Sequence, residues 1–452
     1  MYLRRSNLCA MNYRETLQYL YERLPMFQRI GPAAYKKDLT NIRALCAHIG
    51  EPHTQFASLH VGGTNGKGSV SHLLAALAQM AGLKTGLYIS PHYKDFRERI
   101  KINGRYISPA RVVAFVRQNR EIIEEIQPSF FELCVAMAFD HFARERVDLA
   151  VIEVGLGGRL DSTNIITPLV SVITNISYDH QAMLGNTLAL IAGEKAGIIK
   201  PGVPAVIGET HPESAPVFEK KAQEVGAPLI FADRHYRVEE LSSDGERSAY
   251  SVYREGRLFL PCLEVDVAGP FQQRNLATTL QAWEVFCRQA AARWERAPES
   301  WSVEQLCRQP SGAGLYLPAR RLTRFIGRWQ IIGRSPTILC DSAHNEAALQ
   351  VLWEQLSKEP VRQQHVVVGF VSDKEVEPLL ACFPTSARYY FAKANIPRGL
   401  DAEVLCQKAA AFGLRGKPYR SVRSALGAAR RAARPEDRIV VTGSIFVVAE
   451  VL

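Results

Sequence analysis

Short apolar runs alternate with helical patterns along most of the chain. Residues 83–89, 149–154 and 169–175 are apolar runs of the length and composition of buried strands. Residues 111–126 and 130–144 carry apolar side chains at helical spacing. Alternation of strand and helix predicts a mainly parallel sheet covered by helices on both faces.

The pattern changes twice further along. Short alternating runs in residues 237–263 predict a small antiparallel insertion, and residues 309–319 are rich in Gly, Pro and Ser without periodicity, as expected before a linker. The alternation then returns, with strands expected at 337–340, 365–369, 388–392 and 438–441 and helices at 346–356, 402–412 and 421–433. We therefore predict an α/β protein of two domains, residues 1–317 and 318–452.

Composition fits this organisation. The 452 residues exceed one ordinary core, and 47% hydrophobic with 22% charged residues is typical of a globular protein. Nine scattered cysteines without a C-x-x-C pair favour free thiols in a reducing compartment, so we expect a cytoplasmic protein. We find neither a membrane-length apolar run nor a secretory signal, and expect no membrane partner. An amphipathic helix is expected at 13–24, and residues 1–10 have no assigned role.

The formal net charge of +10 is compatible with nucleic acid or with anionic small molecules. Basic residues occur as local pairs, such as Arg320-Arg321, and not as a tract with interleaved aromatic residues. We therefore expect small anionic substrates and no nucleic acid.

The run from His60 to Ser69, His-Val-Gly-Gly-Thr-Asn-Gly-Lys-Gly-Ser, follows an apolar step and precedes a helical pattern. A strand, a glycine loop and a helix in this order form a phosphate cradle, in which backbone N–H groups, the helix N-terminus and Lys67 face the anion. Gly68 separates Lys67 from Ser69, unlike the usual phosphate loop, where the hydroxyl residue follows the lysine directly.

Polar residues follow two further apolar strands. Glu153 ends one strand before a run of glycines, and a carboxylate beside a phosphate loop suits Mg²⁺. His180, preceded by Asp179, lies beyond another strand and could converge with Glu153. A lone histidine is more often structural, but an Asp-His pair after a third strand favours the functional interpretation. The Glu194-Lys195 pair alone would be interpreted as a helix surface pair.

Two later motifs could bind a nucleotide. Gln272 and Asn275 begin a helix expected to run to about Phe286. They are three residues apart and could share a helix face that reads an adenine edge, with helix capping as the alternative. Arg328 and the Asp-x-x-His motif of Asp341 and His344 could close over a nucleotide between the domains.

These motifs, in this order, resemble the folylpolyglutamate synthase and dihydrofolate synthase family of the Mur ligase superfamily, from about Tyr35 to Val448. The resemblance implies an N-terminal P-loop ATPase domain of the Mur ligase type with a mainly parallel sheet, and a smaller C-terminal Rossmann-like α/β domain. The segments distinctive of the folate branch are Ser90-Pro91-His92, 96–100, 153–164 and 194–198.

The resemblance also implies roles for individual residues. ATP would be bound by Thr64, Asn65, Gly66, Lys67, Gly68, Ser69, Asn275, Arg328 and Asp341. Metal would be bound by Ser90, Glu153, His180 and Lys195, the last as a CO₂-derived carbamate. Lys67, Lys195 and His344 would be catalytic. The folate or pterin would be bound by Ser129, Phe130, Phe131, Glu132, Leu160, Asp161 and Ser162.

The implied activity is an ATP-dependent ligase that joins L-glutamate to dihydropteroate, to (tetrahydro)folate polyglutamates, or to both, through an acyl phosphate. Two Mg²⁺ ions are expected, a monovalent cation is a further candidate, and the enzyme is expected to be a monomer. The extra Gly68 shifts the expected metal-binding hydroxyl from Ser69 to Ser90.

Four positions depart from the family pattern. Phe271 replaces a usual histidine, Ser342 a glycine, and Tyr178 and Tyr93 aliphatic residues. None removes an expected metal ligand, but Phe271 changes the detail expected of the nucleotide contact.

Three other interpretations remain. A Mur-type ligase of UDP-muropeptides would share the phosphate loop, but only about 55 residues precede that loop, too few for its additional N-terminal domain. A nucleic-acid-stimulated ATPase would be expected to carry a basic-aromatic tract. A non-catalytic homologue would be expected to have lost some of the ligands.

Overall fold

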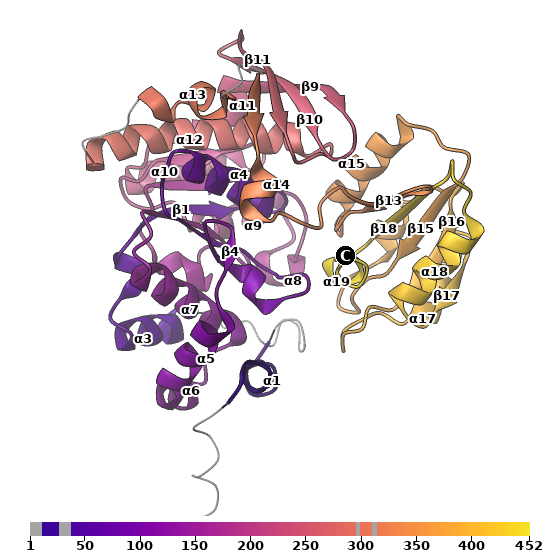
Figure 1. Ribbon diagram of the computed structural model, residues 1–452, viewed down its shortest axis with the longest axis horizontal. Coiled ribbons are helices and arrows are strands. Elements are labelled where there is room, and N and C mark those ends of the chain that lie inside the picture. Colours follow the sequence, from indigo (N-terminus) through magenta and orange to yellow (C-terminus); the bar gives the residue numbers. More distant parts are fainter. Residues whose placement is uncertain (1–10, 27–37, 295–298, 310–313) are drawn as a thin grey trace, which may run out of the picture.

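The computed structural model describes residues 11–26, 38–294, 299–309 and 314–452. Figure 1 shows a larger N-terminal part beside a smaller C-terminal α/β domain. Within the described residues, no helix has the length and apolar character needed to cross a membrane.

An eight-stranded sheet forms the centre of the N-terminal part. In sheet order its strands are β4 (Arg105–Tyr106), β3 (Ile100–Ile102), β2 (Thr85–Tyr88), β5 (Leu149–Glu153), β1 (Ala57–Gly62), β6 (Val170–Ile173), β7 (Ala205–Ile207) and β8 (Leu229–Phe231). The six strands from β2 to β8 are parallel. After β1 the chain forms β2 and β5 on one side of β1 and then β6 on its other side. The strand order therefore reverses at β1, and the carboxyl ends of β5, β1 and β6 meet at this switch point, where α/β sheets bind ligands.

Two apolar cores cover the faces of this sheet. Leu149 and Val151 of β5 belong to the core formed with α4 (Lys67–Met80) and α12 (Gln272–Trp294). Ala150 and Ile152 belong to the core formed with α7 (Phe130–Arg144). Burial on both faces explains the uninterrupted apolar runs from which the strands were predicted. Helices α1 (Tyr13–Arg23) and α3 (Thr40–His48) add to the second core.

The predicted antiparallel insertion is confirmed as β9 (Tyr236–Ser243), β10 (Ser248–Arg254) and β11 (Arg257–Val265). It packs against α12 at the top of Figure 1. Part of residues 309–319, which were interpreted as the approach to a linker, has regular structure. It contains β12 (Leu315–Leu317), which pairs with β11, and the first residue of α14 (Ala319–Thr323). Three strand residues are too few to show a period, and residues 310–313 lie outside the described chain.

The C-terminal sheet has the order β13 (Gln330–Arg334), β14 (Thr337–Cys340), β18 (Arg438–Thr442), β15 (Gln364–Val368), β16 (Arg388–Ala392) and β17 (Gly416–Tyr419). The four predicted strands form its buried centre, whereas the two that were missed, β13 and β17, are its edges. The predicted helices are α15 (Glu346–Ser357), α17 (Ala402–Ala410) and α18 (Val422–Ala432).

Two helix predictions need correction. Residues 111–126 form two helices, α5 (Pro109–Gln118) and α6 (Arg120–Ile126), because the buried side chain of Asn119 donates to the Phe115 carbonyl at 2.8 Å and the chain bends there. Helix α12 continues to Trp294, past its expected end near residue 286. The remaining short helices are α8 (Gln181–Leu184), α9 (Leu188–Ala196), α10 (Ala215–Val225), α11 (Ala232–His235), α13 (Val303–Cys307), α16 (Glu377–Leu380) and α19 (Ile445–Ala449).

Candidate active site

A glycine-rich loop joins the end of β1 to the start of α4. At Gly66, φ is 84°, and a Cβ there would lie 2.3 Å from Oδ1 of Asn275, so only glycine fits between the loop and α12. Lys67 is the first residue of α4, whose free N–H groups and partial positive charge face the loop. Residues 63–69 line a cavity of about 170 Å³. This cavity therefore has the geometry of a phosphate site.

Two lysine side chains meet at one carbonyl of this loop. Nζ of Lys67 and Nζ of Lys195 donate to the Gly63 oxygen at 3.0 and 2.8 Å. Burial, reinforced by the charge of Lys67, lowers the pKa of Lys195 to about 7. Because two adjacent buried ammonium groups repel each other, the site favours a neutral Lys195 beside a charged Lys67.

Glu153 faces the loop from the end of β5. Its Oε2 accepts the N–H of Ser90 at 3.0 Å. Burial raises the pKa of this carboxyl to about 7, and Lys67 offsets the effect only in part, so the charge is incompletely compensated by protein groups. A Cβ at Gly68 would lie 3.7 and 3.9 Å from the two carboxylate oxygens. The unusual glycine thus keeps the space in front of Glu153 open.

The residues predicted to bind metal, Ser90, Glu153, His180 and Lys195, all line this cavity. Burial lowers the pKa of His180 to about 4, so its imidazole is neutral, which is the form that binds a metal ion. Hydroxyl, carboxylate and imidazole groups fit Mg²⁺ or Mn²⁺ once phosphate oxygens complete the shell. No group of three or more His, Cys, Asp or Glu side chains placed to hold a metal occurs in the described chain. A metal ion bound here would therefore also depend on the Ser90 hydroxyl, on Lys195 and on the nucleotide for its ligands.

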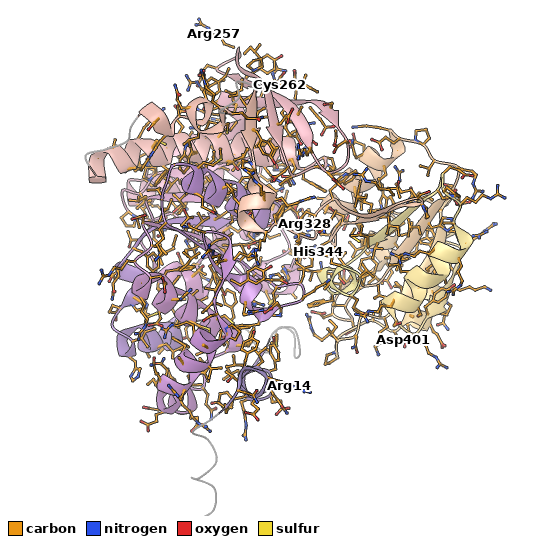
Figure 2. The ribbon with its side chains drawn as sticks, in the orientation of Figure 1. Arg14, Arg257, Cys262, Arg328, His344 and Asp401 are labelled. Atoms are coloured by element: carbon orange, nitrogen blue, oxygen red, sulfur yellow. The ribbon has the colours of Figure 1, made fainter. Side chains whose placement is uncertain are left out.

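Both domains contribute to the opposite wall of the cavity. Asn275 donates to Oε1 of Gln272 at 3.1 Å, so the two amides share one face of α12, as predicted from their spacing. Asp341 accepts the N–H groups of Trp329 and Ala343 at 2.8 and 2.9 Å, which fixes its carboxylate beyond β14. Figure 2 shows Arg328 and His344 in the space between the two domains, and both line the cavity.

A second cavity, of about 500 Å³, adjoins the first. Its lining includes all seven residues predicted to contact the pterin, Ser129, Phe130, Phe131, Glu132, Leu160, Asp161 and Ser162. Ser129 and Glu132 also form the capping box of α7. The buried Oε1 of Glu132 has no hydrogen-bond partner within the described protein, so it is free to accept from a ligand. The two cavities share Ser90, His180 and His344, and ligands in the two would meet there.

Comparison with known proteins identifies the family. The Mur ligase middle domain matches residues 61–282, and the Mur ligase, glutamate ligase domain matches residues 327–445. The chain is 35% identical to folylpolyglutamate synthase of Lacticaseibacillus casei, with 98% of each chain covered. It is 33% identical to dihydrofolate synthase/folylpolyglutamate synthase of Bacillus subtilis, over 82% of this chain and 84% of that one. The chain belongs to the folylpolyglutamate synthase/dihydrofolate synthase family.

Solved structures of this family have the same fold. Escherichia coli FolC in complex with DHPP and ADP superimposes with a TM-score of 0.80 at 28% identity, covering 99% of this chain and 98% of that one. The bifunctional folylpolyglutamate synthase/dihydrofolate synthase of Yersinia pestis, complexed with AMPPNP and Mn ion, gives a TM-score of 0.78 at 27% identity, covering 99% and 98%.

As a member of the folylpolyglutamate synthase/dihydrofolate synthase family, this chain is an ATP-dependent ligase that forms an amide bond. Muropeptide ligases share its two domain types, but the relatives that match it along most of their length are folate enzymes. The Mur-type alternative is therefore not favoured.

One polar network of this family member was missed from the sequence. Lys374 donates to Oδ1 of Asp179 at 3.1 Å and to the His344 carbonyl at 2.7 Å. Nε2 of His344 lies 3.3 Å from Oδ2 of Asp179. The network links the two domains beside the shared wall of the cavities. Lys374 follows β15, and its place beyond a strand's carboxyl end was the available signal.

Arg99 belongs to the segment 96–100, and the sequence alone predicts no role for it. It is 3% exposed and lines the larger cavity. Its Nε donates to Nδ1 of His92 at 2.7 Å, and its guanidinium lies 5.4 Å from the centre of the Phe130 ring. The larger cavity therefore has a fixed cation beside an aromatic surface.

Proposed function

We propose that this enzyme joins L-glutamate to a pterin-bearing acid, either dihydropteroate or a (tetrahydro)folate polyglutamate, where the two cavities meet. The shared lining of Ser90, His180 and His344 is the observation that carries the proposal. It allows a carboxylate from the larger cavity to approach a phosphate held by the loop. A planar ring would fit beside Phe130 and Phe131, with Glu132 and Asp161 as polar partners.

In this proposal the nucleotide occupies the smaller cavity. Thr64, Asn65, Gly66, Lys67, Gly68 and Ser69 hold the phosphates, and Asn275, Arg328 and Asp341 hold the rest of the nucleotide. Ser90, Glu153 and His180 would hold Mg²⁺, which would supply positive charge to the phosphate oxygens. The ADP and the AMPPNP with Mn ion in the solved relatives support this assignment.

Lys195 is proposed to act as a carbamate. A neutral amine attacks CO₂, forms an N–C bond and loses a proton, and the pKa of about 7 makes that neutral form accessible. The resulting anion would lie beside Lys67 instead of a second cation, which removes the repulsion between the two lysines. It would also supply an oxygen ligand for a second Mg²⁺, and a monovalent cation remains a further candidate.

The reaction then has two steps. An oxygen of the acceptor carboxylate attacks the γ-phosphorus, ADP leaves, and Lys67 with the loop N–H groups offsets the charge on the transferred phosphoryl oxygens. The neutral amine of glutamate attacks the acyl carbon, and inorganic phosphate leaves as the amide forms. His344, whose Nε2 lies 3.3 Å from Oδ2 of Asp179, lines both cavities and is proposed to position the incoming amine. Contact between the domains excludes water, which would hydrolyse the acyl phosphate.

The acceptor assay tests this proposal directly. With ATP, Mg²⁺ and glutamate present, phosphate release should require dihydropteroate or tetrahydrofolate and should yield one amide per phosphate. Each acceptor is compared with a muropeptide precursor and with a reaction lacking glutamate. Release that occurs with the muropeptide alone would reject the folate assignment.

Salt should reduce kcat/KM more steeply than kcat. ATP, glutamate and a polyglutamate acceptor are all anionic, and the formal net charge of the chain is +10, so electrostatic attraction speeds their binding. We expect kcat/KM to fall about tenfold between low and high ionic strength. Initial rates in KCl, with sucrose of equal osmolality as control, check this. Equal slopes for kcat and kcat/KM would contradict steering.

We further propose a monomer that acts in the cytoplasm, with domains divided between residues 317 and 318. The division falls in the segment that separates the two family matches. The free thiols among the described cysteines support a reducing compartment. Light scattering of the purified enzyme measures the oligomeric state.

A further inference from the structure

A triangle of polar contacts joins the two domains at the wall of the nucleotide cavity. The hydroxyl of Tyr93 donates to the Gly327 carbonyl at 3.0 Å and lies 2.9 Å from Oγ of Ser342. The Ser342 hydroxyl donates to the same carbonyl at 3.0 Å. Two hydroxyl protons can make two of these three contacts as hydrogen bonds at a time, and with both donated to the carbonyl the Tyr93–Ser342 contact is an approach of two oxygens.

The three residues come from separate segments of the chain. Tyr93 follows β2 of the N-terminal sheet, Gly327 lies between α14 and β13, and Ser342 follows β14 of the C-terminal sheet. The Tyr93 ring packs against the apolar core of the C-terminal domain. A Cβ at Gly327 would lie 2.0 Å from Cζ of Tyr93, so the tyrosine requires glycine at this position. The Tyr93 side chain thus comes from the N-terminal domain and packs into the C-terminal domain.

Tyr93 is also held firmly on its own side. Its backbone N–H donates to Oε2 of Glu98 at 2.6 Å. Oε1 of the same carboxylate, 4% exposed as a residue, accepts the N–H groups of Lys94 and Asp95 at 3.0 and 2.9 Å. The loop that carries the phenol is therefore fixed before it meets the C-terminal domain.

Two corners of the triangle adjoin residues of the nucleotide cavity, and the third, Ser342, lines that cavity itself. Gly327 precedes Arg328, Ser342 follows Asp341, and Tyr93 is three residues beyond Ser90. A shift of the C-terminal domain along the Tyr93 loop would move Arg328 and Asp341 relative to Ser90 and the phosphate loop. Tyr93 and Ser342, which both depart from the family pattern, contact each other here.

We propose that Tyr93 and Ser342 are positioning residues that set the register of the two domains, so that Arg328 and Asp341 face a nucleotide held by the phosphate loop. The proposal rests on the proposed ATP site. Ser342 lines the cavity, but its hydroxyl donates to the Gly327 carbonyl, so both hydroxyls act through the backbone that carries Arg328 or Asp341.

The test uses Tyr93→Phe, Ser342→Ala and the double variant in the full chain. Loss of one hydroxyl should raise the KM for ATP and the Kd for ADP about tenfold and leave the KM for glutamate nearly unchanged. Because both hydroxyls act in one network, the double variant should resemble the more affected single variant instead of showing the product of the two effects.

The matched control is Tyr390→Phe. Its hydroxyl lies 2.9 Å from Nδ1 of His365, so the change removes a buried hydrogen bond of the same domain away from the cavities. It should lower Tm without changing nucleotide affinity. If Tyr93→Phe and Ser342→Ala behave like Tyr390→Phe, the positioning role is rejected. Calorimetric ADP binding tests the register without turnover, so it remains decisive even if the folate assay fails.

Discussion

Replacing Glu153 with alanine should reduce the rate of ligation by about a thousandfold or more while leaving the fold intact. The carboxylate lies between the phosphate loop and Ser90, and burial raises its pKa to about 7. Because protein groups compensate this negative charge only in part, we expect the carboxylate to bind a cation that arrives with the nucleotide. Its removal takes away metal affinity, not packing. Phosphate release measures activity, and Tm with circular dichroism measures the fold.

Two further variants separate metal binding from shape. Glu153→Gln keeps the volume and removes the charge, so it should be nearly as inactive as Glu153→Ala. Glu264→Ala removes an exposed carboxylate on β11 and should have no effect. Near-normal turnover in a folded Glu153→Ala protein would overturn the metal assignment.

Strands that are buried on both faces were predictable from sequence because their central residues, which face the two cores, form an uninterrupted apolar run. This held for β5 and β15, which lie in the centres of their sheets. It failed for β13 and β17, whose edge positions allow Gly333 and Pro418 within the strand. The local sequence of a short polar segment does not show whether that segment pairs with a neighbouring strand.

The site was predictable to the extent that it follows the ends of parallel strands. Glu153 and the phosphate loop meet because β5 and β1 are neighbours in the sheet. Residues at the carboxyl ends of neighbouring parallel strands are expected to lie close together. The pairing of Lys374 with Asp179 depends instead on how two domains contact each other. The same is true of the Gly63 carbonyl shared by two lysines, because that contact depends on where α9 packs.

Replacing Lys195 with alanine should reduce ligation about a hundredfold to a thousandfold. Its Nζ is buried beside Lys67, and a pKa near 7 keeps a large share of it as a neutral amine able to capture CO₂. With ¹³C-bicarbonate, the wild-type enzyme should show a carbamate carbon signal that Lys195→Ala lacks. Lys101 is also buried, with its pKa lowered to about 7 by burial, but its Nζ donates to the Thr323 carbonyl at 2.9 Å away from the cavities. Lys101→Met should therefore keep the signal.

The arginine substitution distinguishes a carbamate from a simple ammonium. If Lys195 served only to donate to the Gly63 carbonyl, Lys195→Arg would keep a cationic donor and retain much of the activity. A guanidinium does not form the carbamate, so the proposed role requires Lys195→Arg to be as inactive as Lys195→Ala. Small carboxylic acids should restore part of the activity of Lys195→Ala, because they can supply an anionic oxygen in the vacated space, and should leave Lys195→Arg inactive. An active Lys195→Arg enzyme would show that the ammonium suffices.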